Sequence, residues 1–254
     1  MLRYLILLTL LPFVVFSLPG QTVYTLAAAQ RELSAGNFDR AAEMLDSLEG
    51  RVVTTPNFYQ ALGNARLETG RLGAAILAYE RGLRLQPGND DLANNLRYAR
   101  EEAGLLDEAA PDFTLLRWWR MAGAVLGTAV AYAIGLLLWW LSLAGALWWF
   151  LRRRRMSEKQ RFALLPAATI LFALALLFFA LGWSRYAFLH ADDQAILQEE
   201  MATLRVAPTA EASAEAQLRA GQRVTITDRV NRYVKVQLND GRQGYLLLDE
   251  LEVI

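Results

Sequence analysis

The sequence predicts a multidomain membrane protein made of an all-α repeat lobe, a hairpin of two transmembrane helices and a small all-β barrel. Glycines recur at a fixed interval in the first part of the chain, two long stretches without charge flank a short basic loop, and apolar residues alternate after position 200. These patterns are typical of stacked helix pairs, membrane-spanning helices and half-buried strands, respectively. Because each pattern is confined to its own segment, we expect the three parts in that order.

The patterns divide the chain into seven consecutive segments. The predicted boundaries are a signal peptide or signal anchor at 1–18, a repeat domain at 22–112, transmembrane helices at 117–151 and 162–184 around a basic loop at 152–161, a linker at 185–200 and a β domain at 201–254.

The first segment has the charge and length pattern of a secretory signal. A single cation, Arg3, precedes an apolar run from Tyr4 to Phe16. An uncleaved signal anchor is the alternative interpretation. Both interpretations export the lobe that follows.

The repeat lobe is predicted from a fixed spacing. Gly36, Gly70 and Gly104 are evenly spaced along the chain, and Ala41 and Ala75 have the same spacing. This period, about 34 residues, is that of tetratricopeptide repeats, in which pairs of antiparallel helices stack side by side. The lobe is therefore expected to be a short stack of such pairs.

Stacks of this kind bind an extended partner along the groove lined by the first helix of each unit. The repeat register places amides, a carboxylate and an aromatic ring in this groove, where amides would hydrogen-bond a peptide backbone. The alternative is that these are solvated polar positions without a ligand. The predicted groove residues are Gln60, Asn64, Glu68, Asn94 and Tyr98.

The two charge-free stretches lie between Arg120 and Arg152 and between Arg161 and Arg185. Each meets the requirement of roughly 20 apolar residues for a helix that crosses a bilayer. The loop between them holds six cations and one anion, and cationic loops stay in the cytoplasm. The sequence thus predicts a membrane hairpin with a cytoplasmic turn, so that the repeat lobe and the barrel both lie outside the cytoplasm. The residues that set this topology are Arg152, Arg153, Arg154 and Arg155.

Small residues recur every four positions in the first span. Such a face permits close approach of two helix backbones within a membrane. The expected partner is the second span, which offers Ala167 and Ala175. A second copy of the chain or a helix of another membrane protein is the alternative. The predicted packing residues are Gly123, Gly127, Ala131 and Gly135.

The last part begins after a linker that we expect to be helical over residues 192–200. Apolar and β-branched residues then alternate with a period of two, which is typical of strands. Asn239-Asp240-Gly241 predicts a hairpin turn, and Gly221 and Gly244 are predicted at bends. About five short strands in some fifty residues suit an SH3-like barrel. The expected strands are Thr203–Val206, Gln222–Thr227, Arg232–Leu238 and Gln243–Leu248.

The stretch from Tyr233 to Tyr245 resembles the central hairpin of bacterial SH3 domains. That family usually has tryptophan at these two aromatic positions, and its rings imply a cell-wall or peptide pocket. Here both positions are tyrosine. We expect Tyr233 and Tyr245 to be partly buried packing residues, with stacking on a ligand as the alternative.

Charge and composition exclude several function classes. Residues 22–112 hold 9 cations and 14 anions and residues 192–254 hold 7 and 11, so neither lobe has the basic balance that nucleic acid requires. The chain has no cysteine, which excludes disulfides and thiolate metal sites. No nucleophile–base pair or metal cluster stands out, and neither span contains the ionisable residue that transport normally needs. We expect no enzyme activity and no cofactor.

The order of the parts is more specific than any one of them. Signal, tetratricopeptide repeats, basic membrane hairpin and terminal SH3-like barrel together resemble the BatE-type proteins of bacterial aerotolerance operons. The most specific stretches are residues 58–65, residues 78–87, residues 94–96 and the barrel hairpin. The resemblance implies a non-enzymatic envelope protein that acts with von Willebrand A-domain membrane proteins and a MoxR-type ATPase, the other products of such operons. It brings no catalytic residues.

Two hypotheses of function follow. In the first, the protein is a scaffold of the bacterial inner membrane. Its repeat groove and barrel face the periplasm and bind proteins, and the hairpin holds them at the lipid bilayer. In the second, it is a cell-wall sensor whose barrel binds peptidoglycan.

Overall fold

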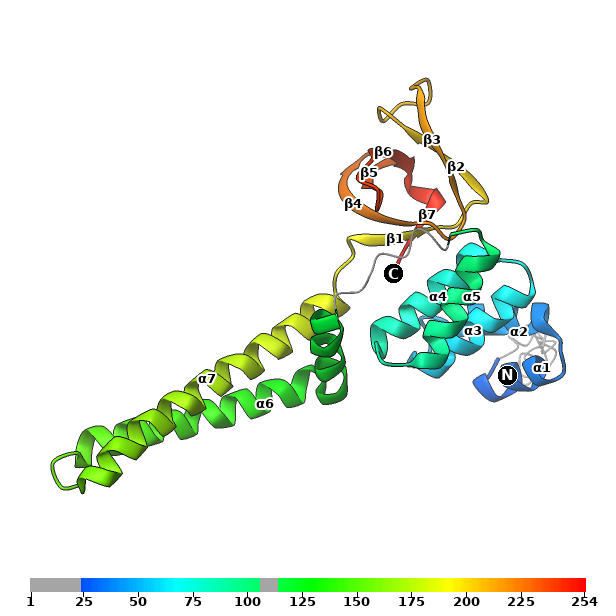
Figure 1. Ribbon diagram of the computed structural model, residues 1–254. Coiled ribbons are helices and arrows are strands. Elements are labelled where there is room, and N and C mark those ends of the chain that lie inside the picture. The colour runs from blue at the N-terminus through cyan, green and yellow to red at the C-terminus, as the bar shows by residue number, and fades with distance from the viewer. Residues whose placement is uncertain (1–23, 106–113) are drawn as a thin grey trace, which may run out of the picture.

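The computed structural model describes residues 24–105 and 114–254, so the expected signal segment at 1–18 lies outside the described residues. The described chain forms a helical lobe, a long helical hairpin and an antiparallel sheet, in the predicted order. Figure 1 shows both lobes at one end of the hairpin, with the turn between its two helices at the far end.

The helical lobe is built from consecutive antiparallel helices. At three of the helix starts, a Thr or Asn side chain caps the first turn. Thr55, for example, accepts a hydrogen bond from the Phe58 amide at 3.2 Å. Neighbouring helices pack against each other along the chain. The helices are α1 (Leu26–Ser34), α2 (Phe38–Leu48), α3 (Pro56–Glu68), α4 (Leu72–Leu85) and α5 (Asp90–Glu102).

The repeat period appears in the structure as a recurring helix end. Gly36, Gly70 and Gly104 follow α1, α3 and α5 and have φ of 77°, 73° and 69°. In each case the next amide donates to a carbonyl five residues before it, as from Arg71 to Arg66 at 2.8 Å. This closure requires a residue with positive φ, which glycine adopts without strain. The same turn geometry thus recurs once per period.

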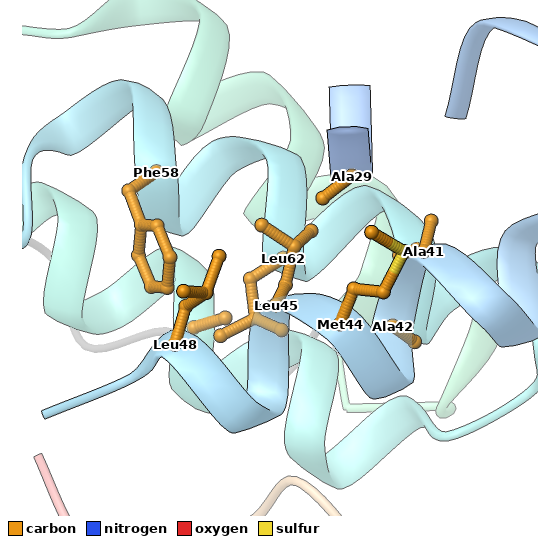
Figure 2. Close-up of a cluster of buried hydrophobic side chains, with 10 residues drawn as sticks. Ala29, Ala41, Ala42, Met44, Leu45, Leu48, Phe58 and Leu62 are labelled. Carbon is orange, nitrogen blue, oxygen red and sulfur yellow. The ribbon is translucent and has the colours of Figure 1, made fainter. Parts of the chain in front are cut away.

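Two apolar clusters hold the lobe together. The first joins α1, α2 and α3 and contains Leu45, Phe58 and Leu62, all essentially inaccessible to solvent (Figure 2). The second surrounds the buried ring of Tyr79 on α4. A Cβ added at Gly63 would lie 2.3 Å from that ring. The absence of a side chain at Gly63 therefore lets α3 and α4 approach closely.

The hairpin consists of α6 (Thr114–Arg152) and α7 (Glu158–Leu189), both long and apolar enough to cross a membrane. Only 17% of the most apolar window of each helix is buried inside the protein. Most of these side chains therefore face outward, unlike those of a core helix in a water-soluble protein. Ser157 starts α7 with a capping box, in which its hydroxyl accepts from the Gln160 amide and the Gln160 side chain accepts in return.

The first span is not one continuous helix, contrary to the prediction. Gly127 has φ 72° and ψ 160°, which breaks α6 into an arm of residues 114–126 and a long segment of residues 128–152. Figure 1 shows the arm turned across the open end of the hairpin. The long segment alone spans about 37 Å at 1.5 Å per residue, which suffices for a bilayer core of about 30 Å. The surplus length of the first run thus lies in the arm.

The last part is a seven-stranded antiparallel sheet in the order β3-β2-β6-β5-β4-β1-β7. The expectation of a helix over residues 192–200 was wrong, because residues 194–197 form β1 between β4 and β7. Pairing with two distant strands overrides the local helix preference there. The strands are β1 (Gln194–Leu197), β2 (Met201–Arg205), β3 (Ala214–Arg219), β4 (Arg223–Val230), β5 (Tyr233–Gln237), β6 (Gln243–Leu247) and β7 (Leu251–Val253), with a 3-10 turn η2 (Leu248–Glu250) before β7.

The predicted turn and one of the two predicted bends are confirmed. Asn239-Asp240-Gly241 connects β5 to β6, with Gly241 at φ 88°. Gly221 lies at the bend between β3 and β4 with φ 86°. Gly244 is instead inside β6, where a Cβ would lie 2.6 Å from the Leu204 side chain. Its role is to let β2 cross closely over β6.

Candidate functional site

Asn64 of the predicted groove is engaged within the helical lobe. Its Oδ1 accepts hydrogen bonds from the Tyr79 hydroxyl at 2.8 Å and from Asn95 Nδ2 at 3.0 Å. These two bonds tie α3 to α4 and α5. Burial, and secondarily the charge of Glu68, raise the pKa of Tyr79 well above its usual value, so its hydroxyl stays a donor. Asn64 therefore holds these three helices together.

The other predicted groove residues are more accessible. Gln60 is half-buried, whereas Glu68, Asn94 and Tyr98 are more open to solvent. They lie on α3 and α5, which contact each other. The Tyr98 ring is 53% exposed, and its hydrogen bond to Glu102 raises the pKa of its hydroxyl. The structure thus places an accessible aromatic side chain and polar groups on the neighbouring helices α3 and α5.

Tyr233 and Tyr245 lie on the face of β5 and β6 that points away from the barrel core. Val234 and Leu246, on the same two strands, are buried, and both tyrosines are half-buried. Tyr233 pairs with Leu247 across the strands, and Tyr245 pairs with Lys235. The two rings therefore share one partly accessible face of the sheet.

Three of the four predicted packing residues lie at the contact between α6 and α7. Ala131 is 1% exposed, a Cβ at Gly135 would lie 3.1 Å from the Phe179 ring, and one at Gly123 would lie 3.4 Å from Arg185. Gly127 is the exception, with nothing within 4 Å of a Cβ. It forms the break in α6, because its positive φ is incompatible with a continuous helix.

On α7, Ala175 is buried as expected, but the other buried alanine is Ala168 and not Ala167. The Ala168 carbonyl accepts a hydrogen bond from the Ser142 hydroxyl at 2.8 Å. Residues 168 and 175 are seven positions apart, which is two helical turns and one face. The contact between the spans therefore has the regular spacing of a packed helix pair.

Arg152 is the last residue of α6, and the other three arginines of the loop follow it directly. The Arg152 guanidinium lies 4.8 Å from the Trp148 ring centre, and that of Arg153 lies 5.7 Å from the ring of Trp149. All four arginines are exposed. Cations over tryptophan rings at a helix end are typical of the membrane–water boundary.

The helical lobe and the barrel share a core. Ile196 of β1 is completely buried within the second apolar cluster, beside residues of α4 and α5. Ile76 of α4 reaches Gly221 so closely that a Cβ there would lie 2.3 Å from it. A Cβ at Gly73 of α4 would likewise lie 2.8 Å from the Leu197 carbonyl oxygen. The two lobes are therefore one packed body.

Arg84 of α4 joins all three parts of the molecule. Its guanidinium donates to the carbonyls of Phe188 at 2.9 Å and Ala191 at 2.5 Å, and also to the Ile254 backbone oxygen. In return, Arg185 of α7 donates to the carbonyls of Arg84 at 2.9 Å and Leu85 at 2.7 Å. The end of α7 is thus fixed against the end of α4 by two arginines acting in opposite directions.

Further ion pairs extend this contact. Arg81 donates to Glu49 at 2.8 Å, to Glu252 at 2.9 Å and to the Val253 carbonyl at 2.6 Å, so it links α4 to the end of α2 and to β7. On the other side of α4, the nearly buried Glu80 pairs with Arg100 of α5 and Arg223 of β4.

A cavity of about 320 Å³ lies where the three parts meet. It is bounded by α4, α5, the arm of α6, the end of α7 and the barrel. Its wall is rich in arginine. The lining residues are Glu80, Leu83, Arg84, Pro87, Ala93, Leu96, Arg100, Leu105, Arg117, Arg120, Phe188, Gln194, Gly221, Arg223, Asn239 and Ile254.

Sequence reasoning did not find this junction. Arg81 and Arg84 belong to a helical stretch in which an exposed polar face is the usual expectation, and their partners in the hairpin and the barrel lie more than 100 residues away. The sequence held one indication of the junction, because Arg117 and Arg120 lie one helical turn apart just before a charge-free run.

Comparison with known proteins agrees with the prediction of an SH3-like domain at the C-terminal end of the chain. Residues 202–252 match the family model of the bacterial SH3 domain. Neither the comparison with curated proteins nor that with solved structures found a match. The chain therefore carries a C-terminal bacterial SH3 domain in an antiparallel sheet, behind a helical part and two apolar helices.

Proposed function

We propose that this protein is a non-enzymatic scaffold of the bacterial inner membrane that binds other proteins through a tetratricopeptide repeat lobe and its SH3-like barrel. The observation that carries the proposal is that both lobes lie together at one end of the hairpin. Both dock on each other and on the same end of the membrane hairpin, opposite the basic loop. A rigid pair of binding modules at a fixed height above the bilayer suits the holding of partners.

Several features support the repeat and the topology. The helix end at Gly36, Gly70 and Gly104 recurs with the period of tetratricopeptide repeats. The four arginines at one end of the hairpin favour a cytoplasmic loop, which puts both lobes in the periplasm. The resemblance to BatE-type proteins suggests von Willebrand A-domain membrane proteins and other products of aerotolerance operons as partners.

The partner-binding surface is tested with point variants in the full-length chain. Deleting the whole helical lobe would expose Ile196 and Gly221 of the barrel, so a deletion cannot separate binding from folding. We expect Asn94→Ala with Tyr98→Ala to reduce partner recovery from membranes at least tenfold. Val53→Ala, at a side chain 91% exposed on the loop before α3, is the matched control. Equal recovery by both variants contradicts the groove assignment.

The topology is tested with a reporter that is active only after export. A fusion after Ile254 should be active and one at Ser157 inactive. The opposite pattern contradicts the periplasmic placement of the lobes.

The bacterial SH3 match favours a second function, binding of peptidoglycan through the face that carries Tyr233 and Tyr245. The full-length protein in detergent should then co-sediment with purified cell wall, and Tyr233→Ala with Tyr245→Ala should abolish this. Thr203→Ala with Thr227→Ala is a control on the same barrel. Absence of co-sedimentation leaves the protein scaffold as the function.

A further inference from the structure

The arm of α6, residues 114–126, folds back to the level at which α7 ends. In the long segment of α6, the Tyr132 ring packs on Gly182, where a Cβ would lie 3.2 Å from it. Trp119 lies thirteen residues before Tyr132, so a continuous helix would carry it about 20 Å further along the hairpin. Its Nε1 instead donates to the hydroxyl of Ser184 at 3.0 Å. Because Ser184 is only two residues beyond Gly182, the arm stays beside the last turns of α7.

Other contacts hold the arm at this level. A Cβ at Gly123 would lie 3.5 Å from the Leu181 side chain and 3.4 Å from that of Arg185. The Arg120 guanidinium lies 4.9 Å from the ring centre of Phe188. These partners belong to the last two turns of α7. The arm therefore crosses the end of the hairpin (Figure 1) and does not lengthen it.

The end of α7 has the residues expected at the edge of an apolar layer. Trp183 and Tyr186 are 66% and 47% exposed, and their ring centres are 6.4 Å apart. Trp and Tyr prefer the boundary between membrane and water. Arg185, between them, ends the charge-free run of α7. The inference that follows rests on the proposed insertion of the hairpin in a bilayer, which would put the arm at the membrane surface on the side of the lobes.

The arm is amphipathic. Leu115 is 72% exposed, Trp118 66% and Val125 87%. At 3.6 residues per turn, these three positions share one face of the helix. Arg117 and Arg120 fall on the opposite side, where both line the cavity at the junction. The apolar face of the arm therefore points away from that cavity.

This apolar face is continuous with the outer surface of the hairpin. Just beyond the break at Gly127, Val130 is 50% exposed, and further along the long segment Leu137 and Trp140 are each 60% exposed. Side chains of this kind need an apolar cover. A bilayer that covers the hairpin up to Trp183 also reaches the arm, because the arm lies at the same level.

We propose that the arm is an interfacial helix whose apolar face inserts into the lipid leaflet at this end of the hairpin. Such helices lie in the membrane plane, with their apolar side chains buried about 5–10 Å into the boundary between headgroups and acyl chains. The side chain of Met121 packs on Gly88, where a Cβ would lie 2.8 Å from it. Because Gly88 lies between α4 and α5, the arm sets how closely the helical lobe approaches the membrane.

The test measures the depth of spin labels in the full-length protein, reconstituted in vesicles of phosphatidylethanolamine and phosphatidylglycerol. The chain has no cysteine, so each single-cysteine variant carries one label. Leu115→Cys and Val125→Cys report on the two ends of the apolar face. Leu137→Cys reports on the bilayer interior, and Val53→Cys, at a side chain 91% exposed on the helical lobe, reports on water. Collisions of each label with oxygen and with a water-soluble nickel complex give its depth.

Both labels on the arm should lie about 5–10 Å below the lipid phosphates. Their depths should differ by no more than about 7 Å, half of the roughly 15 Å that would separate them in a helix perpendicular to the membrane. A difference of about 15 Å contradicts the in-plane orientation. Aqueous values on the arm with a lipid value at Leu137 contradict this proposal alone. An aqueous value at Leu137 contradicts the membrane insertion of the proposed function as well.

A charge on the apolar face should lift the arm. Trp118→Asp in the Val125→Cys protein should move the label toward the aqueous value of Val53, because a charge among acyl chains is costly. Arg97→Asp, at an exposed position on α5, is the control and should leave the label in place. A label that stays at the same depth in the Trp118→Asp protein contradicts insertion of this face.

A second copy of the chain is the alternative occupant of the face. It would bring two Val125 labels together and broaden their spectrum, and dilution with unlabelled protein would remove the broadening. That result would overturn the lipid assignment. We expect the spectrum of the Val125 label to be the same before and after dilution.

Discussion

Helices α6 and α7 pack through small side chains and aromatic rings, whereas the helical lobe meets the hairpin through arginines and main-chain oxygens. In the hairpin, Trp139 packs on Phe172 with ring centres 5.2 Å apart. At the junction, Arg84 and Arg185 exchange hydrogen bonds with carbonyls of the opposite part. The first contact joins two consecutive helices, whereas the second joins segments about 100 residues apart, and the two use different interactions.

The difference follows from the surroundings expected of each contact, a bilayer around the hairpin and water around the junction. Within a bilayer, burial of apolar groups gives no advantage, so close packing of small residues stabilises helix pairs. At the water boundary, helix ends expose carbonyls that need donors, and arginine supplies several in a fixed plane. The hairpin should therefore respond to changes in side-chain volume and the junction to changes in charge, except where Ile76 and Gly221 give the junction a packed core of its own.

The largest loss of stability is expected where Ile76 packs against Gly221. Gly221→Val introduces a β-branched residue at φ 86° and a Cβ 2.3 Å from Ile76. Backbone strain and overpacking together should lower the free energy of unfolding by about 3–5 kcal/mol. Gly241→Ala has a similar φ of 88° with nothing within 4 Å and should cost only about 1 kcal/mol. Equal melting temperatures for the two variants would show that the lobes are not docked.

Removal of the Arg84 guanidinium should have the next largest effect. Arg84→Met keeps an apolar stem but leaves carbonyls at the ends of α7 and β7 without their donor, which should weaken docking by about 2–3 kcal/mol. Hydrogen exchange of the full-length protein should increase at residues 188–193 and 251–254. Arg97→Met, at an exposed position on α5, is the control and should change neither region.

A larger side chain between α6 and α7 tests whether the hairpin responds to side-chain volume. Gly135→Leu places a side chain against the Phe179 ring, which a Cβ alone would approach to 3.1 Å, and should cost about 1–3 kcal/mol. Gly145→Ala meets Ala168 at an ordinary 3.6 Å and should be nearly neutral. Thermal unfolding in detergent measures both. A neutral Gly135→Leu would mean that α6 and α7 do not pack along this face.

The smallest effect concerns pH at the turn η2 of the barrel, where Glu250 lies. Burial raises the pKa of Glu250 above its usual 4.5, although the Leu247 amide opposes the shift. A raised folded pKa contributes stability that is complete below about pH 4.5 and is lost as pH rises through the folded pKa. The wild type should therefore lose stability relative to Glu250→Gln as the pH rises from about 4.5 through the folded pKa of Glu250. A difference that does not change with pH would contradict the raised pKa of this carboxylate.

Much of the fold was predictable because the signals are local. The glycine period found the three equivalent helix ends, and the charge-free runs found both apolar helices. The Asp-Gly turn found the hairpin between β5 and β6. Each of these depends on composition or spacing that can be read along the chain.

The errors share one cause. Residues 194–197 form a strand only because β4 and β7 flank them, and Gly127 breaks α6 where its small neighbours suggested a packing face. Ala168, and not Ala167, lies at the helix contact, since the packing of two helices decides which side of each is buried. None of these outcomes is encoded in the local pattern.

The sequence by itself determined the order of the parts, the repeat period, the two apolar helices and the charge of their connecting loop, since composition and periodicity act within short segments. The tertiary structure decided that the lobes share a core, that Arg84 and Arg185 fasten them to the hairpin, and that five arginines surround one cavity. Those arginines come from α4, α5, α6 and β4, which lie far apart along the chain. Only folding brings such distant charges together, because the cost of their repulsion and the gain from packing are set by the whole molecule.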